Sequence, residues 1–352
     1  MKKLLQVLGI LLLVILTAAA ALLVWLSVTE FRPRAVEKVE ISGGSEQRAL
    51  KQGEELKLLC WNIGYGGLGK YSDFFMDGGE NVAAADEAQV RSYMDGIKKT
   101  AEAAGADFML LQEVDADSSR SYGIDERTYF GGSYAKSAYA MNYSCKFVPF
   151  PLPPIGKVNS GLYTVSEGYA IDQAERRALP CPFKWPVSTA NLKRCLLLTY
   201  LPIEGSDKQL VLVNLHLEAY DDGSGKLAQR MLLEQILVEE YEKGNYVIAG
   251  GDFNSSFQGS HALYPIKNPD LWLPGALPDN IMPEGWTLAY DVSVPTCRLL
   301  NQPYDPEDEA TQYYVIDGYI LSPNVELISV ETLDEGFENS DHNPVLLKAL
   351  LK

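Results

Sequence analysis

Cysteine pairs with metal-binding spacing are missing from this sequence of 352 residues. Its five cysteines are odd in number and none follows the CxxC pattern, which argues against a thiolate zinc domain. Cys60 and Cys195 lie in apolar runs and are expected to be buried. Cys145 and Cys181 lie in loop-like sequence, where pairing in an oxidising compartment stays open.

Basic residues are scarce as well. Lys and Arg total 30 against 47 Asp and Glu, which gives a formal net charge of −17 and a pI near 4.7. Non-specific binding of nucleic acid needs basic surface that displaces counterions from phosphates, so this balance argues against such a binder, although it leaves a local basic patch open. The other bulk properties are those of an ordinary globular protein with a sizeable core.

One long apolar run stands at the N-terminus. After two lysines, residues 4–26 are almost uninterruptedly apolar, and about 20 such residues suffice to cross a bilayer. We therefore predict a membrane anchor over residues 1–28, with the remaining chain outside the cytoplasm. A cleaved secretory signal, and hence a secreted protein, is the alternative, because the small residues TAAAA form a candidate cleavage site; apolar sequence continues beyond them.

The remaining chain divides into a tether and one domain. Residues 29–55 are polar and charged, which predicts a tether between membrane and domain. Over residues 56–352, short β-forming runs alternate with helical patterns. Helices are predicted over 86–104 and 226–243 because apolar residues there recur at helical spacing, and a glycine marks the end of each. The runs RCLLLTYLPI and QLVLVNLHLEA, joined by EGSDK, predict a β-hairpin.

Two segments, residues 115–159 and 254–306, are rich in turn-forming residues and poor in strand patterns. Long irregular segments within a compact domain are often binding loops. Mixed strand pairing together with helices favours an α/β sandwich over a purely parallel sheet.

A set of polar residues shares one position, at or just beyond the end of an apolar strand. Glu113, for example, ends FMLLQE, and a buried carboxylate there must find a cation or hydrogen-bond donors. Strand ends on a rigid scaffold are where convergent polar groups form a site. The set consists of Asn62, Glu113, His216, Asp252, Asn254, Asp317, Asp341 and His342.

Each of these residues alone has an ordinary structural explanation. Asn62 and Asp252 suit turns, His216 suits a buried core position, and Glu113 suits a salt bridge; His261 is interpreted as a surface loop residue. Together, two of three histidines, four carboxylates and two amides make a working set. Oxygen ligands without thiolates suit a hard cation such as Mg²⁺ or Mn²⁺, which polarises a phosphoryl oxygen while a histidine or carboxylate activates water.

The motifs WN, LQEV, NLHL, GDFN, IDG and SDHNPV occur in this order and resemble those of the endonuclease/exonuclease/phosphatase superfamily. This superfamily includes deoxyribonuclease-I-like enzymes, neutral sphingomyelinases and inositol-polyphosphate 5-phosphatases. The resemblance covers about residues 56–352, and GDFN and SDH with LQE upstream are its specific part. It implies an α+β fold, a four-layer α/β/β/α sandwich of two mixed β-sheets flanked by helices, here preceded by one transmembrane helix in a membrane-anchored member of bacterial type.

The resemblance also implies roles for the matching residues. Glu113 is similar to the main metal ligand, and Asn62 and Asp341 would bind the metal directly or through water. His342 would activate water or stabilise the phosphoryl charge, and Asp317 would orient its ring.

Three further roles follow from the same resemblance. Asp252 is the other candidate base, Asn254 would hold a phosphate oxygen, and His216 would donate to the phosphate or protonate the leaving group. Whether Asp252 or His342 takes the proton is left open.

One departure from the family pattern concerns His216. In deoxyribonuclease-like members a carboxylate on the preceding strand supports the equivalent histidine, but here that vicinity reads NLKR and is basic. The general-acid role is therefore in doubt, and Lys193 or Arg194 is a candidate for contact with substrate phosphate instead. Tyr122 and Arg120, in the loop after Glu113, are further candidates for substrate contact.

We therefore expect a Mg²⁺-dependent hydrolase of a phosphodiester or phosphomonoester, carried by a lipid or small molecule and met outside the cytoplasmic membrane. An extracellular nuclease acting on DNA or RNA is the alternative that the motifs support and the net charge does not. A non-catalytic binding protein on the same fold is the alternative of another class, and it predicts no metal-dependent turnover.

Overall fold

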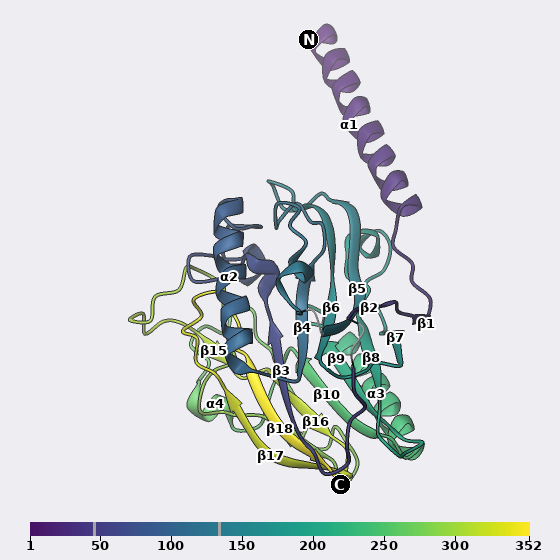
Figure 1. Ribbon diagram of the computed structural model, residues 1–352. Helices are drawn as coiled ribbons and strands as arrows, with labels where there is room; N and C mark the ends of the chain where they lie inside the picture. The colour runs from purple at the N-terminus through teal and green to yellow at the C-terminus, as the bar shows by residue number, and fades with distance from the viewer. Residues whose placement is uncertain (45–46, 133–134) are drawn as a thin grey trace.

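The computed structural model describes residues 1–44, 47–132 and 135–352. Its domain contains two mixed sheets of seven strands each (Figure 1). The first sheet has the order β1 (Val36–Lys38), β7 (Gln173–Ala178), β8 (Cys195–Pro202), β9 (Gln209–His216), β10 (Tyr246–Asp252), β16 (Asp317–Leu321) and β13 (Thr287–Ala289). The second has the order β17 (Val325–Thr332), β18 (Val345–Leu351), β3 (Glu55–Asn62), β4 (Phe108–Asp115), β6 (Gly156–Glu167), β5 (Ala135–Val148) and β2 (Ile41–Gly43).

Short elements complete the chain around these sheets. Two small pairs form from β11 (Ser255–Ser256) with β12 (Gly275–Ala276) and from β14 (Cys297–Arg298) with β15 (Tyr313–Tyr314). The short helices are η1 (Gly64–Gly66), η2 (Phe75–Asp77), η3 (Glu126–Tyr129), η4 (Val187–Ala190) and α4 (Ser260–Leu263).

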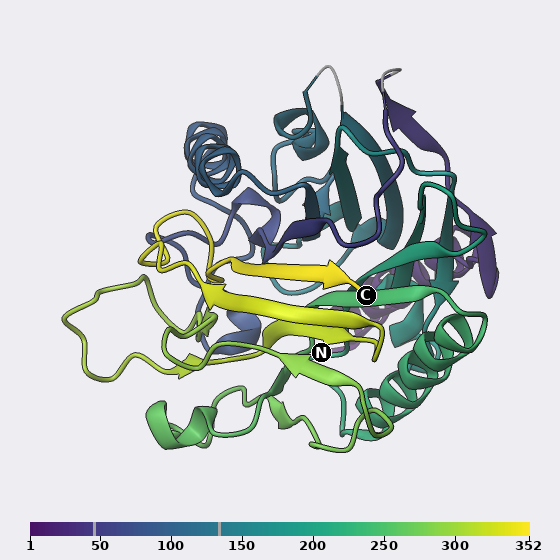
Figure 2. The same ribbon diagram turned by 60° about the horizontal axis from the view of Figure 1, so that its bottom comes forward.

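Alternation along the strands separates the layers. On β3, Leu58 and Cys60 face the first sheet and are packed with Leu212 and Ile248, whereas Trp61 faces the opposite way. Successive strand residues point to opposite faces, so one apolar strand serves two cores. Helices α2 and α3 cover the outer faces of the second and first sheet, respectively (Figure 2). The four-layer sandwich predicted from the sequence is confirmed.

Both long domain helices match their predicted ranges. Helix α2 spans Glu87–Ala104; the side chain of Asp86 accepts a hydrogen bond from the backbone N–H of Gln89, and Gly105 ends the helix in the left-handed conformation. Helix α3 spans Ser224–Glu242. The predicted hairpin is also present, as β8 pairs antiparallel with β9.

Two predictions about irregular segments differ from the structure. Residues 115–159 contain β5, a strand of 14 residues that pairs with β6 along most of its length. The predicted tether contains β1, which pairs with β7, and β2, which pairs with β5. Both sets of strands were missed because their sequences are mixed in polarity, and short edge strands need only a few backbone hydrogen bonds to hold them.

Helix α1 (Lys2–Val28) projects from the domain (Figure 1). The helix has 27 residues and includes a stretch of 18 with a mean hydropathy of 3.0, so it is long and apolar enough to cross a membrane, a property that signal sequences share. At its C-terminal end Leu26 is buried against Tyr143, Val148 and Val158 of the domain. The base of the helix is thus part of the folded unit.

All five cysteines are free thiols. Cys60 and Cys195 are buried, as predicted. Cys145 and Cys181, for which pairing was an open alternative, do not form a disulfide in the structure.

Candidate functional site

One cavity of about 630 Å³ collects most of the predicted site residues. They come from the ends of neighbouring strands in both sheets: Asn62 ends β3, His216 ends β9 and Asp252 ends β10. Because β3 and β4 are parallel, as are β9 and β10, their carboxyl ends open on the same edge of the sandwich. The cavity lining includes Asn62, Glu113, His216, Asp252, Asn254, Asp341 and His342.

Asp252 lies at the centre of this group. Its Oδ2 accepts a hydrogen bond from Nδ2 of Asn62 at 3.1 Å and is 3.5 Å from Nε2 of His216. It lies 3.9 Å from Nε2 of His342 and 3.4 Å from Nδ2 of Asn254. Segments more than a hundred residues apart therefore meet around a single carboxylate oxygen.

Two site residues occupy left-handed backbone conformations. Glu113 has φ of 54° where the pairing of β4 with β6 is interrupted between Leu111 and Val114. Asn254 has φ of 46°, and its backbone N–H donates to Oδ1 of Asp252 at 2.8 Å. A strand bulge re-aims the side chain it carries, and such strained positions gather at functional sites. The nearby Oε1 of Glu113 accepts from Nδ2 of Asn62 at 3.3 Å.

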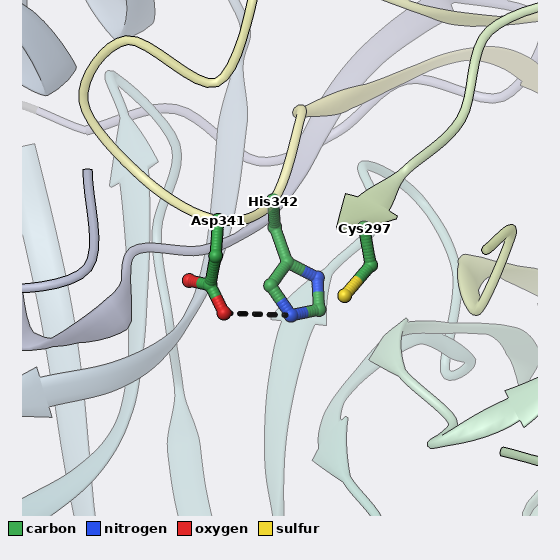
Figure 3. A group of neighbouring side chains, drawn as sticks. All are labelled: Cys297, Asp341 and His342. Atoms are coloured by element: carbon green, nitrogen blue, oxygen red, sulfur yellow. Dashed lines mark ion pairs between the residues drawn. The ribbon is translucent and has the colours of Figure 1, made fainter. Parts of the chain in front are cut away.

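The ring of His342 is fixed from behind. Its Nδ1 lies 2.9 Å from Oδ2 of Asp317, which leaves Nε2 facing the cavity, 3.9 Å from Oδ2 of Asp341 (Figure 3). Burial alone would lower the pKa of His342, but the combined effects of Asp317, Cys297 and Asp341 outweigh burial, so the pKa is raised well above its usual value. Asp317 thus lies behind the His342 ring, on the side away from the cavity.

His216 has the opposite electrostatic setting. Burial, together with the positive charge of Arg194, lowers its pKa well below the usual value, so the ring is neutral at pH 7. Its Nδ1 has no hydrogen-bond partner among the described residues. The backbone carbonyl of His216 accepts from Nη1 of Arg194, whose Nε pairs with Glu218 at 3.3 Å. Among the described residues no carboxylate supports the His216 ring at Nδ1, although Oδ2 of Asp252 lies 3.5 Å from Nε2.

Two buried carboxylates of the site have raised pKa values. Burial and the neighbouring Asp317 raise the pKa of Asp252 to about 7, against the opposing effect of His342. Burial raises the pKa of Asp341 to about 7; Glu113 adds to this effect and His342 opposes it. Buried carboxylates that repel one another fit a bound cation, which would relieve both desolvation and repulsion.

Two groups of side chains have ligand atoms within 4.8 Å of one another: Asp252, Asp317 and His342, and Cys297, Asp341 and His342. In both groups Nδ1 of His342 already lies 2.9 Å from Oδ2 of Asp317, so only Nε2 of the ring is available to a metal. Burial also raises the pKa of the Cys297 thiol to about 12, so the thiolate is disfavoured. The same cavity also offers the oxygen donors of Asn62, Glu113 and Asp341, and oxygen donors suit a hard cation.

Only some of the residues predicted to contact substrate line the cavity. Arg194 and Arg120 both line the cavity; Arg194 pairs with Glu218 and Arg120 with Asp115 at 3.0 Å. Tyr122 is not among the lining residues, and its hydroxyl donates to the backbone carbonyl of Ala84. The structure thus brings the two arginines to the cavity but not Tyr122. His261, interpreted as a surface residue, is exposed.

Several cavity residues were missed by the sequence analysis. Tyr65 follows Asn62 closely, lines the cavity and stacks under Arg120, whose guanidinium carbon is 3.7 Å from the ring centre. Its hydroxyl has no hydrogen-bond partner among the described residues. Asp77 accepts from the Tyr220 hydroxyl at 2.9 Å, and both line the cavity. The glycines on either side of Tyr65 were the available signal, since they permit the positive φ angles of this turn.

Comparison with known proteins agrees with this geometry. The model of the Endonuclease/Exonuclease/phosphatase family matches residues 59–342. No curated protein sequence matches the chain.

Solved structures share the fold at low sequence identity. ANGEL2, a 2',3'-cyclic phosphatase in complex with adenosine-2',3'-vanadate, has a TM-score of 0.55 and 15% identity over 90% of this chain and 99% of its own. An endonuclease/exonuclease/phosphatase from Beutenbergia cavernae has a TM-score of 0.53 and 16% identity over 84% of this chain and 72% of its own. The human Nocturnin catalytic domain, with a bound sulfate anion, has a TM-score of 0.51 and 14% identity over 89% and 97%.

Proposed function

Because the chain belongs to the endonuclease/exonuclease/phosphatase family, we propose that its cavity hydrolyses a phosphoester of a lipid or small molecule with the help of Mg²⁺. The observation that carries the proposal is the convergence of Asn62, Glu113, His216, Asp252, Asp341 and His342 on one buried cavity. Carboxylates, amides and imidazoles gathered in this way supply the ligands, bases and donors that phosphoryl transfer to water requires.

The cation would be held by Glu113 and Asp341, with Asn62 beside them. When bound, Mg²⁺ polarises a phosphoryl oxygen and stabilises the leaving oxygen; Mn²⁺ has the same ligand preference. Asn62 is positioned for this place by its own turn, because its Oδ1 accepts from the backbone N–H of Gly64 at 3.1 Å. Its Nδ2 holds Glu113 and Asp252 in place.

Two side chains are candidates for taking the proton from the attacking water, Asp252 through Oδ2 and His342 through Nε2, which lie 3.9 Å apart. Asp252 would do so as the carboxylate, and His342 only as the neutral ring. Asn254 would hold a phosphate oxygen. The neutral His216 is placed to donate through Nε2, which lies 3.5 Å from Asp252. Arg194 and Arg120 supply positive charge at the cavity wall for an anionic substrate.

We also propose that α1 remains attached and anchors the domain outside the cytoplasmic membrane. Its base is integrated into the domain: Leu26 is 3% exposed, and Nε1 of Trp185 donates to Oγ of Ser27 at 3.0 Å. Lys193 pairs with Glu30 at 2.9 Å just beyond the helix. Cleavage within TAAAA would leave these contacts on a short, unanchored stub.

The test uses the full-length protein with Mg²⁺ on parallel panels of plasmid DNA, RNA, sphingomyelin and phosphoinositides. Asp252→Ala and His342→Ala should abolish turnover without unfolding, and Glu113→Gln should raise the Mg²⁺ concentration needed for half-maximal rate. His261→Ala, at an exposed position, is the matched control and should be fully active. Chelation of the metal should stop the wild type.

Three outcomes would contradict this function. Plasmid cleavage that His342→Ala abolishes, without lipid turnover, would identify a nuclease. No metal-dependent turnover on any phosphoester would favour a binding protein. Equal loss of thermal stability in all three site variants would show structural roles.

A further experiment decides between the two candidate bases. Restoration of turnover in His342→Ala by added imidazole would show that His342, rather than Asp252, takes the proton from water.

A further inference from the structure

The cavity continues from its polar end to a wall formed in part by α1. Beyond the catalytic side chains, its lining includes Leu23, Leu26, Phe150, Ile155, Phe183 and Val187. These residues come from three segments: the base of α1, the loop between β5 and β6, and the loop that leads into η4. A single cavity therefore has a polar end suited to a phosphoester and an apolar end that contacts α1 only at the last turns of the helix.

Apolar side chains are also exposed around this end of the cavity. Phe150 is 68% exposed, Leu152 88%, Trp185 63% and Val187 56%; we call these four residues the apolar rim. Soluble proteins expose single apolar residues commonly, but a cluster of large ones beside a cavity marks an interaction surface.

The charge of the rim segments differs from that of the whole chain. Residues 143–158 and 180–194 contain no Asp or Glu, although the chain has 47, and they contain five Lys and Arg. Lys146 and Lys184 are exposed and form no ion pair within the part of the chain that the structure describes. Basic side chains next to exposed apolar ones suit the surface of a membrane that contains anionic lipids.

The geometry places this surface beside a bilayer. Figure 1 shows α1 leaving the domain at the end where the β5–β6 loop lies, opposite the C-terminus. A helix of 27 residues is about 40 Å long, and the hydrocarbon core is about 30 Å thick. With the N-terminal lysines at one face of the bilayer, the turns around Leu23 and Ser27 reach its other face. Trp185, which is hydrogen-bonded to Ser27, then lies at the membrane–water interface, where tryptophan is enriched in membrane proteins.

We propose that the apolar rim inserts into the leaflet next to α1 and that the substrate is a membrane lipid with a phosphoester headgroup, which enters the cavity from the bilayer. The headgroup phosphate would lie at the polar end and the hydrocarbon would lie along the wall that Leu23, Leu26 and Phe183 form. This inference rests on the proposed function, and it names the substrate class.

The first experiment separates the two proposals. Full-length protein in vesicles of phosphatidylglycerol, phosphatidylethanolamine and sphingomyelin is assayed with Mg²⁺ by phosphorus NMR, and in parallel on the soluble diester bis(p-nitrophenyl) phosphate. Leu152→Glu changes a residue that does not line the cavity. We expect it to reduce lipid hydrolysis at least about tenfold, because a charge replaces an inserted apolar group, and to leave hydrolysis of the soluble diester unchanged.

Met231→Glu is the matched control. Met231 is 61% exposed on α3, away from the rim, so this variant should hydrolyse lipid like the wild type. Lipid hydrolysis unaffected by Leu152→Glu, or turnover of the soluble diester without any lipid turnover, would overturn the inference and leave the proposed function standing. Failure to hydrolyse either substrate would overturn the proposed function.

A second readout is independent of catalysis. Tryptophan fluorescence is recorded in vesicles whose phosphatidylcholine carries bromine on its acyl chains, for the wild type and for Trp185→Phe. Quenching that is greater in the wild type is expected, since Trp185 would lie within reach of the bromines. Equal quenching in both proteins would show that the rim stays in water and would overturn the inference.

Discussion

His216 and His342 are almost equally buried, at 4% and 5% exposure, yet their pKa values move in opposite directions. Burial lowers the pKa of both rings, so the difference comes from their neighbours: Arg194 near His216, and Asp317 beside His342. Both neighbours are themselves held, Arg194 by Glu218 and Asp317 by its place at the start of β16. A neighbouring charge therefore sets the direction of each shift, whether it lies inside a motif, as Asp317 does, or outside the motifs, as Arg194 does.

Tyr65 gives a direct test at this scale. We expect Tyr65→Phe to keep the free energy of unfolding within about 0.5 kcal/mol of the wild type or to raise it, because the lost hydroxyl has no partner among the described residues. If this hydroxyl binds substrate, kcat/KM falls about tenfold. Denaturant unfolding and steady-state kinetics measure the two quantities.

Tyr319→Phe is the matched control. The Tyr319 hydroxyl donates in the core to the carbonyls of Leu58 and Val345 at 3.0 Å. Its loss should reduce the free energy of unfolding by about 1–2 kcal/mol without a corresponding loss of kcat/KM. A Tyr65→Phe protein with reduced stability and unchanged kinetics would show that the Tyr65 hydroxyl stabilises the fold and does not bind substrate.

Asp77 provides a pH-dependent prediction. Burial raises its pKa from 3.8 to about 6, despite hydrogen bonds from Tyr220 and Leu300 and the more distant charges of His342 and Arg298. A carboxyl whose pKa is higher in the folded state binds more protons there, so its ionisation destabilises the fold as pH rises from about 4 through 6. We expect the stability of Asp77→Asn, relative to the wild type, to rise across this window by up to about 3 kcal/mol.

Chemical denaturation at several pH values, with metal chelated, measures this difference. The Asn side chain can still accept from the Tyr220 hydroxyl, so a constant offset between the two proteins is expected as well. A difference that does not change between pH 4 and 7 would show that Asp77 has an ordinary pKa.

The sequence predicted the site residues that lie in strand-end motifs and missed those in loops. Asn62, Asp252 and His342 each adjoin an apolar strand, and strand ends on one edge must converge. Tyr65 and Asp77 lie in short turns whose paths depend on contacts with distant segments, such as the bond from Tyr220 to Asp77. Local sequence carries no record of such contacts.

At the scale of elements, the bulge in β4 positions Glu113 and lowers the stability of the fold. A side chain with φ of 54° costs about 1–2 kcal/mol relative to glycine. We expect Glu113→Gly to be more stable than Glu113→Ala by about 1 kcal/mol, although both should be inactive.

The neighbouring position supplies the control. At Gln112, which precedes the left-handed residue on the same strand, alanine should instead be more stable than glycine by roughly 0.5–1 kcal/mol. Thermal or denaturant unfolding of the four variants measures both differences. The same ranking at both positions would mean that the backbone at Glu113 relaxes and stores no strain.

Strand prediction succeeded where apolar runs are long and failed where polarity is mixed. The strands β3, β4, β9 and β10 are buried on both faces and have nearly continuous apolar sequences. Strand β5 alternates buried and partly exposed residues and includes Lys136, Asn142 and Lys146, so its 14 residues resemble a loop. Its partner β6, rather than its own composition, makes it a strand.

For the whole molecule, the order of the motifs was enough to predict four layers, but not the apolar end of the cavity. That wall needs α1, the β5–β6 loop and the segment before η4 to meet, and these lie more than a hundred residues apart at the extremes. Each segment taken alone indicates only an anchor or a proline-rich loop.

The location of the domain can be tested by chemical labelling. Cys181 is the one cysteine that is not fully buried among the five. In Cys181→Ser/Glu204→Cys, the new thiol replaces a 66% exposed side chain in the β8–β9 turn. We expect a membrane-impermeant maleimide to label this protein in intact cells, in the membrane fraction.

Cys181→Ser without the added cysteine is the control and should remain unlabelled. Labelling that requires permeabilised cells would place the domain in the cytoplasm. Labelled protein found only in the medium would show that the anchor is cleaved.

The pairing of β1 with β7 and of β2 with β5 has a consequence for any shortened form of the chain. A protein that began at residue 56 would uncover backbone donors and acceptors on one margin of each sheet. Unpaired margins of this kind recruit strands from other copies, which leads to domain exchange or fibrils. The segment that carries β1 and β2 thus prevents self-association through these two sheet edges, and its removal should yield polymers even in detergent.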